Sequence, residues 1–517
     1  MNGEALNEVK VETVCRVKNL GEIHENSLKK SCLFEKKSFE KVVQVGKKSL
    51  EKVVVFFEKS FEKVLYLQRI CCIIISYMLK RKIEQKLLQW KRSENHNPLV
   101  VKGCRQCGKT YSVIDFAQKN YKNVIYLNFF ENPEYSQIFS GSLEVDKIVM
   151  YITAALGTEV VFEPKHTCIV LDEIQECPKA RTALKFFKLD GRYDVICTGS
   201  LLGLEGYRND PASIPVGYET VVDMYPLDFE EFLWANGITD EIIQVVHDCV
   251  EQESPVPLPL HSRFRELLLQ YAVVGGMPQV VDTFIETHLL NVVLEMQRNI
   301  VNSYKDDMVK YSTAADKSLI RECFESIPKQ LAKENKKFKY SILKKGATAA
   351  KYAGCLQWIE DAGIISRCYN LTITELPLDG NAVADVFKVY MCDMGLFVSM
   401  LEDGVQFDIL HGNLYGYKGA IFENLMADFL VKMGRKLYYY HKDSGLEIDF
   451  VIRYKGKCAL VEVKSTNGNA KSAKTILNHP EKYHVEECLK FGDYNVGRRD
   501  KFLTLPFYTA FLMQGKF

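Results

Sequence analysis

The sequence predicts an α/β protein whose first large domain is built on a parallel β-sheet covered by helices. Three observations lead to this prediction. Apolar segments of strand length alternate with helical segments from residue 98 to about residue 237, which is the βαβ rhythm of a three-layer sheet. The stretch 103–110 reads G-x-x-x-x-G-K-T directly after an apolar segment, and a second apolar segment ends in two carboxylates. Together these features predict a phosphate-binding site at one edge of the sheet.

The glycine-rich stretch Gly103–Thr110 follows the apolar run Leu99–Val101 and precedes a helical pattern. Its two glycines permit a tight turn that points backbone N–H groups at phosphate oxygens. Lys109 can reach the β and γ phosphates of a nucleotide, and the Thr110 hydroxyl can ligate Mg²⁺. The helix that begins near Lys109 adds its positive N-terminal end to the same site. We therefore expect this stretch to bind ATP together with Mg²⁺.

A second apolar strand, Cys168–Leu171, ends in the carboxylates of Asp172 and Glu173. Unbroken apolar strands are typical of parallel sheets that are covered on both faces. Open α/β sheets bind ligands at the carboxyl ends of their strands. We therefore expect Asp172 to organise the Mg²⁺ shell and Glu173 to polarise the attacking water. The alternative is a buried strand that simply ends in acidic loop residues.

A third strand, Val195–Cys197, runs into Thr198 and Ser200 at the same edge of the sheet. Either hydroxyl could sense the γ-phosphate or cap the next helix. Cys104 and Cys107 form a C-x-x-C pair inside the glycine-rich stretch, for which we favour two small loop-filling residues over redox control of nucleotide binding. The residues that the sequence assigns to nucleotide binding are Gly103, Cys104, Arg105, Gln106, Cys107, Gly108, Lys109, Thr110 and Ser200.

Composition and charge limit the functions that the chain can have. Its 517 residues provide for several domains, and a net charge of +1 confines any nucleic-acid surface to a local patch. The 16 cysteines show no disulfide framework and no zinc spacing, which suits the reducing cytoplasm. The apolar stretch 70–79 is about half of the ~20 residues that cross a bilayer, and residues 1–40 are too charged for a signal peptide. We expect a cytoplasmic protein without a membrane partner.

The first 77 residues differ from the rest of the chain. The segments 37–43, 48–54 and 59–65 repeat with a period of eleven residues, which equals three helical turns and places their apolar residues on one face. A helical appendage, a self-associating coil, a low-complexity insertion and an over-extended start all remain open. The enzyme-like part begins near Met78, where translation could start.

A helical region follows the predicted sheet. The stretch Tyr225–Leu233 predicts a loop that enters a helix through an Asp228 cap, with acidic residues in the first turn. Helical segments continue to about residue 311, and Gly275–Pro278 predicts a turn between two of them.

Residues 318–375 match the pattern of a winged helix, with helices at 323–334 and 347–362 and a pair of strands within 364–369. This module is rich in lysine, and Glu334 is the only acidic residue in the lysine-rich stretch. One interpretation is a DNA-contacting face, and the other is a solvated lysine-rich face or a wing packed on another domain. The lysines are Lys329, Lys333, Lys336, Lys337, Lys339, Lys344, Lys345 and Lys351.

A second set of charged residues lies near the C-terminus. The segment 447–464 predicts a two-stranded hairpin, with Glu462 and Lys464 on one face of its second strand and Asp449 on its first. Two carboxylates beside a lysine could hold Mg²⁺ and activate water against a phosphodiester. Glu423, on a preceding helix, can complete this acidic set. The alternative is an edge hairpin with cross-strand ion pairs of little energetic weight.

With both halves in view, the chain resembles a prokaryotic family of ATP-binding proteins. In that family an AAA-type P-loop ATPase domain precedes a winged helix and a C-terminal domain of unknown function that is similar to the PD-(D/E)xK restriction-endonuclease fold. The motifs that carry the resemblance are Gly103–Thr110, Leu171–Gln175, Thr198–Ser200, Tyr225–Leu227, Gly275–Pro278, and Glu423 with Asp449, Glu462 and Lys464. The resemblance leaves residues 1–77 outside as an N-terminal extension. It implies an α/β P-loop NTPase domain at 78–240, a helical region at 241–315, a winged-helix module at 316–376 and a nuclease-like α/β domain at 377–517.

The leading hypothesis is a Mg²⁺-dependent ATPase whose cycle acts through DNA or a protein partner. In it, Lys109 and Glu173 are catalytic, while Thr110 and Asp172 hold the metal. An ATP-regulated, metal-dependent nuclease and a nucleotide-switched scaffold with little turnover are the alternatives. The sequence also leaves open whether the chain assembles into a homo-oligomer.

The resemblance also implies an arginine at the site. AAA-type enzymes commonly use one, often from a neighbouring subunit, to stabilise the charge of phosphoryl transfer. Arg208 is the best-placed candidate by its position after the third strand, and Arg263 and Arg265 are alternatives.

Overall fold

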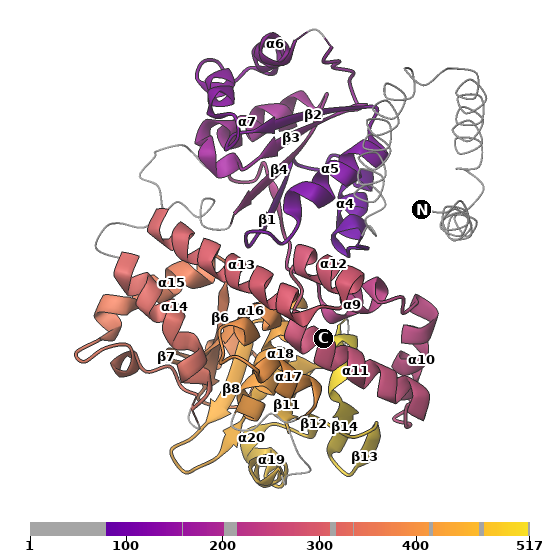
Figure 1. Ribbon diagram of the computed structural model, residues 1–517, viewed down its shortest axis with the longest axis vertical. Helices are drawn as coiled ribbons and strands as arrows, with labels where there is room; N and C mark the ends of the chain where they lie inside the picture. Colours follow the sequence, from indigo (N-terminus) through magenta and orange to yellow (C-terminus); the bar gives the residue numbers. More distant parts are fainter. Residues whose placement is uncertain are drawn as a thin grey trace, which may run out of the picture. The chain divides into compact units, whose positions relative to one another are not determined.

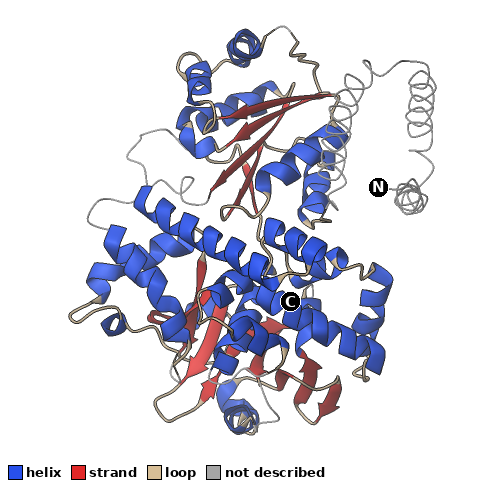
Figure 2. Ribbon diagram, viewed as in Figure 1, coloured by secondary structure: helices blue, strands red, loops and turns tan. Residues whose placement is uncertain are grey.

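The computed structural model describes most of the chain beyond residue 78 (Figures 1 and 2). The described residues are 79–157, 159–200, 215–310, 317–333, 336–412, 417–464 and 470–514. The repeats within residues 1–77, the suggested start at Met78 and the candidate Arg208 lie outside them. Leu79–Phe517 form one of the two compact units of the chain. Within the described part, no helix combines the length and the apolar composition that crossing a membrane requires.

A five-stranded parallel sheet forms the first domain, in the order β2–β3–β4–β1–β5, and confirms the α/β class that was predicted for this domain. Every residue of β3 is buried, as its apolar run predicts. Because β4 lies between β1 and β3, three strands end side by side at Gly103, Asp172 and Ser200. The strands are β1 (Leu99–Gly103), β2 (Asn123–Asn128), β3 (Thr167–Asp172), β4 (Asp194–Ser200) and β5 (Thr220–Asp223).

Helices cover both faces of this sheet (Figure 1). Helices α4 (Ile83–Arg92) and α5 (Lys109–Asn120) pack their apolar side chains on one face, where the alternate strand residues Val101, Val170 and Ile196 lie. Helices α6 (Val145–Leu156) and α7 (Pro178–Asp190) pack on the other face. The period-2 alternation of the strands therefore builds a three-layer domain that places the start of α5 beside the end of β1.

Five helices connect the sheet to the C-terminal half. Asp228 caps the first of them as predicted, because its side chain accepts from the Glu231 backbone N–H while the Glu231 side chain accepts from the Asp228 N–H. The predicted turn at Gly275–Pro278 separates α11 from α12, and a Cβ on Gly276 would lie 2.0 Å from the carbonyl oxygen of Leu227. The helices are α9 (Phe229–Ala235), α10 (Asp240–Glu251), α11 (Leu258–Val274), α12 (Pro278–Thr287) and α13 (Leu290–Lys310).

The predicted winged-helix segment contains helices α14 (Lys317–Leu331) and α15 (Ala349–Asp361), followed by strand β6 (Ile365–Leu371). The prediction of a pair of strands within residues 364–369 is wrong, because the only strand in this segment is β6. Its antiparallel partner is β7 (Ala382–Met391), and β6 also pairs in parallel with β8 (Leu437–His441). Strands β6 and β7 therefore belong to a larger sheet. The domain boundary expected at residue 376 falls between these two strands, which are hydrogen-bonded to each other.

The C-terminal half contains a four-stranded sheet, β7–β6–β8–β9, and a five-stranded sheet, β10–β11–β12–β14–β13. The predicted hairpin is confirmed as the antiparallel pair β10–β11, whose turn residues Lys455 and Gly456 both have positive φ. Its first strand is interrupted at Asp449, which lies between β9 and β10. The remaining strands are β8 (Leu437–His441), β9 (Glu447–Ile448), β10 (Phe450–Tyr454), β11 (Lys457–Val463), β12 (Glu487–Gly492), β13 (Gly497–Arg499) and β14 (Phe502–Pro506). The remaining helices are α16 (Met394–Ser399), α17 (Val405–Leu410), α18 (Lys418–Lys432), α19 (Lys471–Leu477) and α20 (Pro480–Tyr483).

Candidate functional site

The glycine-rich stretch forms a tight loop between β1 and α5 (Figure 1). Gly108 has a φ of 93° and immediately precedes α5, so this position favours glycine. A Cβ on Gly103 would lie 2.1 Å from the carbonyl oxygen of Met224, so this position also excludes any larger residue. Gln106 adopts a φ of 63°, which turns the loop once more between the two glycines. The backbone is therefore bent as a phosphate-binding loop requires.

Lys109, the first residue of α5, directs its side chain into this loop. Its Nζ donates to the carbonyl oxygens of Gly103, at 3.1 Å, and Cys104, at 2.8 Å. The side chain is buried, and within the described residues no ion pair joins it to a carboxylate. The ammonium group is thus held beside the loop with its positive charge uncompensated by an acid, as a group that binds phosphate oxygens must be.

Asp172, at the end of β3, accepts hydrogen bonds from several neutral donors. The Thr110 hydroxyl lies 2.9 Å from its Oδ1 and the Tyr126 hydroxyl 2.7 Å from its Oδ2. The Thr198 hydroxyl, from β4, also donates to Oδ1. Thr198 is therefore tied to Asp172, whereas Ser200 stands opposite Gly103 in the β1–β4 register.

The pairing of Thr110 and Asp172 fits a magnesium ion. Both supply hard oxygen atoms, and both come from the elements that the sequence assigned to this role. Mg²⁺ in nucleotide sites is commonly held by one or two such protein oxygens together with phosphates and waters. The donor set is therefore suited to Mg²⁺ and not to a softer metal.

Glu173 follows Asp172 at the same strand end. Its backbone is left-handed, with a φ of 52°, and its side chain is half-buried. The side-chain amide of Gln175 donates to its Oε2. This contact fixes one carboxylate oxygen, and the strand end places the group next to Asp172, where a water-activating residue is expected.

Cys104 and Cys107 lie inside the loop as buried free thiols. The hydrogen bond between them raises the pKa of the Cys104 thiol well above its usual value, and burial adds to this rise. The same hydrogen bond lowers the pKa of Cys107 to about 6, with the nearby charges of Lys109 and Arg81 acting in the same direction. The sulfurs fill the loop interior, which is the placement that the loop-filling interpretation expects.

Arg81 is a functional-site residue that the sequence reasoning missed. Its buried guanidinium donates to the loop carbonyl of Cys107 at 3.0 Å, to the carbonyl of Tyr225 at 2.7 Å and to Glu231 Oε1 at 3.1 Å. The partners are up to 150 residues away in the chain, so no local pattern signals the contact. Arg81 ties the phosphate loop to the capped start of α9.

The contacts of Arg105 with α13 were also missed. The Arg105 guanidinium donates to Asp307, and the Tyr304 hydroxyl donates to the Arg105 carbonyl oxygen at 2.9 Å. The two alternative arginine candidates lie elsewhere, on α11. There Arg263 pairs with Glu266 and Arg265 with Asp493. Within one chain, neither is brought to the phosphate loop.

The C-terminal charged residues come together around α18 and the hairpin. Asp449 accepts from the backbone N–H of Val463 at 2.8 Å and lies 3.9 Å from the Lys464 ammonium, which also contacts Glu462. Glu423 is buried and contacts two further lysines, Lys336 and Lys388, which the sequence reasoning did not place there. We call these residues, with Glu447, the C-terminal charge cluster.

Burial and neighbouring charges shift the pKa values of the acidic residues in this cluster. Burial raises the pKa of Asp449 to about 7, and the negative charges of Glu423 and Glu462 add to this rise. Burial also raises the pKa of Glu462. The charges of Lys388 and Lys336 oppose the effect of burial at Glu423 and hold its pKa below the usual value. The carboxylates are therefore close enough to interact, and lysines balance them.

The cluster does not fit the expected divalent metal. Of the residues that the structure describes, no group of three or more His, Cys, Asp or Glu side chains is placed to hold a metal ion. Lys388 Nζ lies 3.6 Å from Glu423 Oε2 and 3.0 Å from Glu447 Oε1, so an ammonium group occupies the space between two acids. The four predicted residues are brought together, but as an ion-pair cluster.

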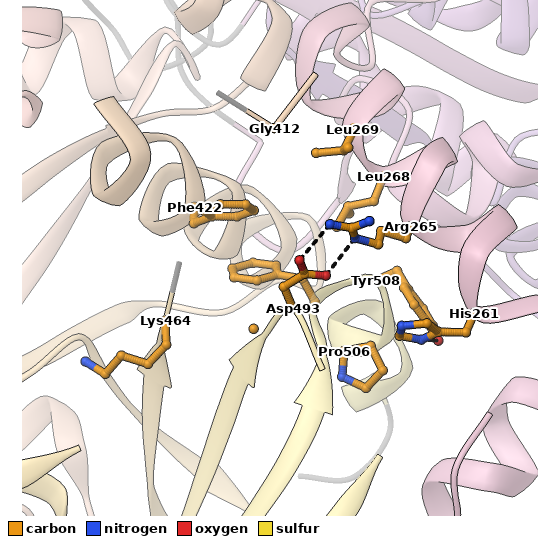
Figure 3. A pocket seen from close by; sticks show the side chains of 12 residues that line it. His261, Arg265, Leu268, Leu269, Gly412, Phe422, Lys464, Asp493, Pro506 and Tyr508 are labelled. Atoms are coloured by element: carbon orange, nitrogen blue, oxygen red, sulfur yellow. Dashed lines mark hydrogen bonds and ion pairs between the residues drawn. The ribbon is translucent and has the colours of Figure 1, made fainter. Parts of the chain in front are cut away.

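A pocket lies beside this cluster, at the carboxyl ends of the parallel strands β11, β12 and β14 (Figure 3). Its wall is mainly apolar and includes Phe422 and Leu268, with Lys464 at one side. Arg265 and Asp493 are joined by an ion pair at its rim, and His261 bonds Tyr508. Its polar groups are thus largely engaged with one another.

Three family models match separate parts of the chain. Residues 95–233 match the AAA domain, residues 265–406 a domain of unknown function (DUF8612), and residues 418–508 a domain of unknown function (DUF4143). The first match covers the parallel sheet and the phosphate loop, so this part is an AAA-type P-loop domain. The other two descriptions name no function. Among proteins with curated descriptions, none matches the chain.

Several solved structures show weak similarity. The Walker-type ATPase PABY2304 of Pyrococcus abyssi is 13% identical with a TM-score of 0.37, and the match covers 62% of this chain and 96% of that one. The Aeropyrum pernix ORC1 protein in complex with DNA is 13% identical with a TM-score of 0.25, covering 62% and 91%. AMPPCP-bound DnaA from Aquifex aeolicus is 12% identical with a TM-score of 0.24, covering 54% and 86%. The assignment of the AAA-type domain rests on the family model and the sheet order.

Proposed function

We propose that the chain is a Mg²⁺-dependent ATPase whose nucleotide state is transmitted to its C-terminal half. The observation that carries the proposal is the convergence of three strand ends on one site. Lys109 lies in the bent loop, Thr110 and Asp172 lie 2.9 Å apart, and Glu173 stands beside them. The match of residues 95–233 to the AAA domain supports the same activity.

The roles of the residues follow from their chemistry. The loop N–H groups and Lys109 hold the β and γ phosphates of ATP. Thr110 and Asp172 would hold Mg²⁺, which neutralises charge on the phosphate oxygens when bound. Glu173 accepts a proton from water as the water oxygen attacks the γ-phosphorus. The bond from that phosphorus to the β–γ bridging oxygen then breaks and leaves ADP and phosphate.

The partner is proposed to be DNA or a protein that contacts the lysine-rich surface around α14 and α15. All the lysines named for this module are exposed, except Lys336, which contacts Glu423. Glu334 lies outside the described residues. Binding of DNA would fall steeply with added salt, since each phosphate contact releases counterions. A flat salt response would favour a protein partner.

The alternatives differ in what they require. A nuclease needs a metal, and we derive no step at the C-terminal charge cluster because its residues do not fit one. A nucleotide-switched scaffold requires the same phosphate loop but little turnover. The ATPase proposal is therefore distinguished by hydrolysis itself.

The test is ATP turnover with and without DNA, in wild type, Glu173→Gln and Asp449→Ala. Glu173→Gln should bind ATP normally but hydrolyse it about 10²–10⁴ times more slowly, because an amide cannot accept the proton. Glu176→Gln, three residues further along, is the matched control and should keep its turnover. Undiminished turnover in Glu173→Gln would remove this residue from its role. DNA cleavage that disappears in Asp449→Ala would favour the nuclease.

A further inference from the structure

The phosphate loop contains a pair of cysteines, Cys104 and Cys107, whose chemistry the proposed ATPase does not use. Among the 16 cysteines of the chain, no other two have this C-x-x-C spacing. Both thiols are free, and the two residues are 5% and 0% exposed. Filling the loop interior explains the small size of these side chains, but it does not explain why both are thiols.

The two thiols are hydrogen-bonded to each other, with Cys104 donating to the sulfur of Cys107. The Cys107 side chain folds back toward the start of the loop. A Cβ on Gly103, the residue before Cys104, would lie 3.1 Å from the Cys107 sulfur. The two sulfurs therefore lie side by side, as the formation of a disulfide bond requires.

Positive charges next to Cys107 favour its thiolate form. The hydrogen bond from Cys104 lowers the pKa of Cys107 to about 6, against the opposing effect of burial. The charges of Lys109 and Arg81 lower this pKa further, and the Arg81 guanidinium donates to the Cys107 carbonyl oxygen at 3.0 Å. The thiolate is the nucleophilic form of cysteine. One acidic thiol beside one protonated thiol is the arrangement that reversible disulfide chemistry uses.

We propose that Cys104 and Cys107 form a redox modification site, at which a peroxide joins the two sulfurs in a disulfide bond and thereby weakens nucleotide binding. The inference rests on the proposed function, because it assigns a regulation to the loop that holds ATP. Disulfides of proteins in a reducing compartment are usually transient and sense the redox state. The pair therefore lowers ATP binding when peroxide accumulates.

Hydrogen peroxide, which is small and uncharged, is the oxidant. The Cys107 sulfur attacks one peroxide oxygen, the O–O bond breaks, and a sulfenic acid forms while the released hydroxide takes up a proton and becomes water. The Cys104 sulfur then attacks the Cys107 sulfur. The S–O bond breaks, and the leaving hydroxide departs as a second water with the Cys104 thiol proton. The two sulfurs lose two electrons in total, which reduce one peroxide to two waters. A dithiol restores both thiols by exchange.

The disulfide affects the nucleotide because both cysteines belong to the backbone that turns around the phosphates. The Cys104 carbonyl oxygen accepts from Lys109 Nζ at 2.8 Å, and Gln106, between the two cysteines, has a φ of 63°. A disulfide bond holds its sulfurs about 2 Å apart, which is closer than a hydrogen bond between thiols. Closing it pulls Cys104 toward Cys107, turns the N–H groups between them and shifts a carbonyl that positions Lys109. Bound ATP holds the loop open and should slow the oxidation.

The first measurement detects the bond itself. The full chain is treated with hydrogen peroxide, its remaining thiols are alkylated, and the unfolded chain is digested with trypsin. Because trypsin cleaves after Arg105, it separates the peptides 103–105 and 106–109, each of which carries one of the two cysteines. The two peptides should stay joined after oxidation, should separate on addition of dithiothreitol, and should join more slowly when ATP and Mg²⁺ are added before the peroxide.

The second measurement is calorimetric titration of the reduced and the oxidised chain with a non-hydrolysable ATP analogue and Mg²⁺. Oxidation should lower the affinity of wild type about tenfold or more, the value of one lost contact to a charged group, and dithiothreitol should restore it. In Cys104→Ser and in Cys107→Ser, the reduced and oxidised samples should bind equally well. Cys249→Ser is the matched control, because this half-buried thiol lies on α10 outside the loop, and oxidation should weaken its binding as in wild type.

The two proposals fail in different ways. Separate peptides after oxidation, or equal affinities of reduced and oxidised wild type, overturn the inference and leave the proposed function intact. A loss of affinity on oxidation that persists in Cys104→Ser also overturns the inference, since another group would then be responsible. Reduced wild type that binds no nucleotide overturns the proposed function, and with it the regulation, even where the joined peptides form.

Discussion

The phosphate loop and the C-terminal charge cluster both combine a lysine with carboxylates at the carboxyl ends of parallel strands, yet they are built differently. In the loop, Lys109 Nζ donates to two backbone carbonyls and forms no ion pair with a carboxylate among the described residues, and the donors to Asp172 are neutral groups. In the cluster, Glu423 contacts the ammonium groups of Lys336 and Lys388. The first site leaves its charges for a ligand, whereas the second balances them internally. This difference separates a binding site from a structural ion-pair network better than residue types do.

The largest predicted effect compares Lys109, at the start of α5, with Lys464, directly after β11. Lys109→Ala should lower ATP affinity about a thousandfold, because at least two charge-assisted contacts to phosphate are lost. Lys464→Ala should leave ATP affinity unchanged, since Lys464 contacts Glu462 and Asp449 and not the loop. Equilibrium binding of a fluorescent ATP analogue measures both. Equal losses in the two variants would contradict the distinction.

A second prediction concerns the buried pair that anchors the loop. Arg81→Ala leaves Glu231 buried without its ion-pair partner and should destabilise the fold by about 3 kcal/mol. The neighbouring exposed pair of Lys80 with Asp240 supplies the control, and Lys80→Ala should cost less than about 1 kcal/mol. Urea unfolding gives both values. A loss in Arg81→Ala as small as that of the control would show that the anchor contributes little.

The smallest predicted effect concerns the raised pKa of Asp449 in the C-terminal charge cluster. Burial and neighbouring acids raise the pKa of Asp449 to about 7, so the folded chain holds a proton there that the unfolded chain releases near pH 4. Stability from this group is therefore lost as pH rises from about 4 to 7. The free energy of unfolding of Asp449→Asn, relative to that of wild type, should therefore increase by on the order of 2 kcal/mol from pH 5 to pH 8.

The control for this pH effect is Asp379→Asn. Lys436 lowers the pKa of the exposed Asp379, so its protonation does not change between pH 5 and pH 8. Urea unfolding at the two pH values should show a pH-dependent gain for Asp449→Asn and none for Asp379→Asn. A gain of the same size in both variants would mean that Asp449 is not specially placed.

Local patterns in the sequence predicted much of the first domain and its site. The loop, the two strand ends and the Asp228 cap each depend on residues within a few positions of one another, so spacing alone identifies them. The parallel sheet followed from the alternation of apolar strands and helices. The hairpin β10–β11 was predicted for the same reason, since both strands and their turn are contiguous.

Contacts between distant elements could not be predicted in this way. Arg105 meets Asp307 across 202 positions, and the strand paired with β6 begins beyond the segment where both strands were expected. The ion pairs at Glu423 were missed because Lys336 and Lys388 lie on other elements. One signal was present, since Lys388 stands within the apolar run of β7, where a lysine needs a buried partner.

The most direct test of the central claim is calorimetric titration of the wild-type chain with ATP, in the presence and absence of Mg²⁺. The phosphate loop opposite Asp172 predicts one ATP bound per chain, with an affinity that Mg²⁺ increases and that Asp172→Asn makes less dependent on the metal. A folded sample that binds no purine triphosphate with Mg²⁺ would contradict the claim.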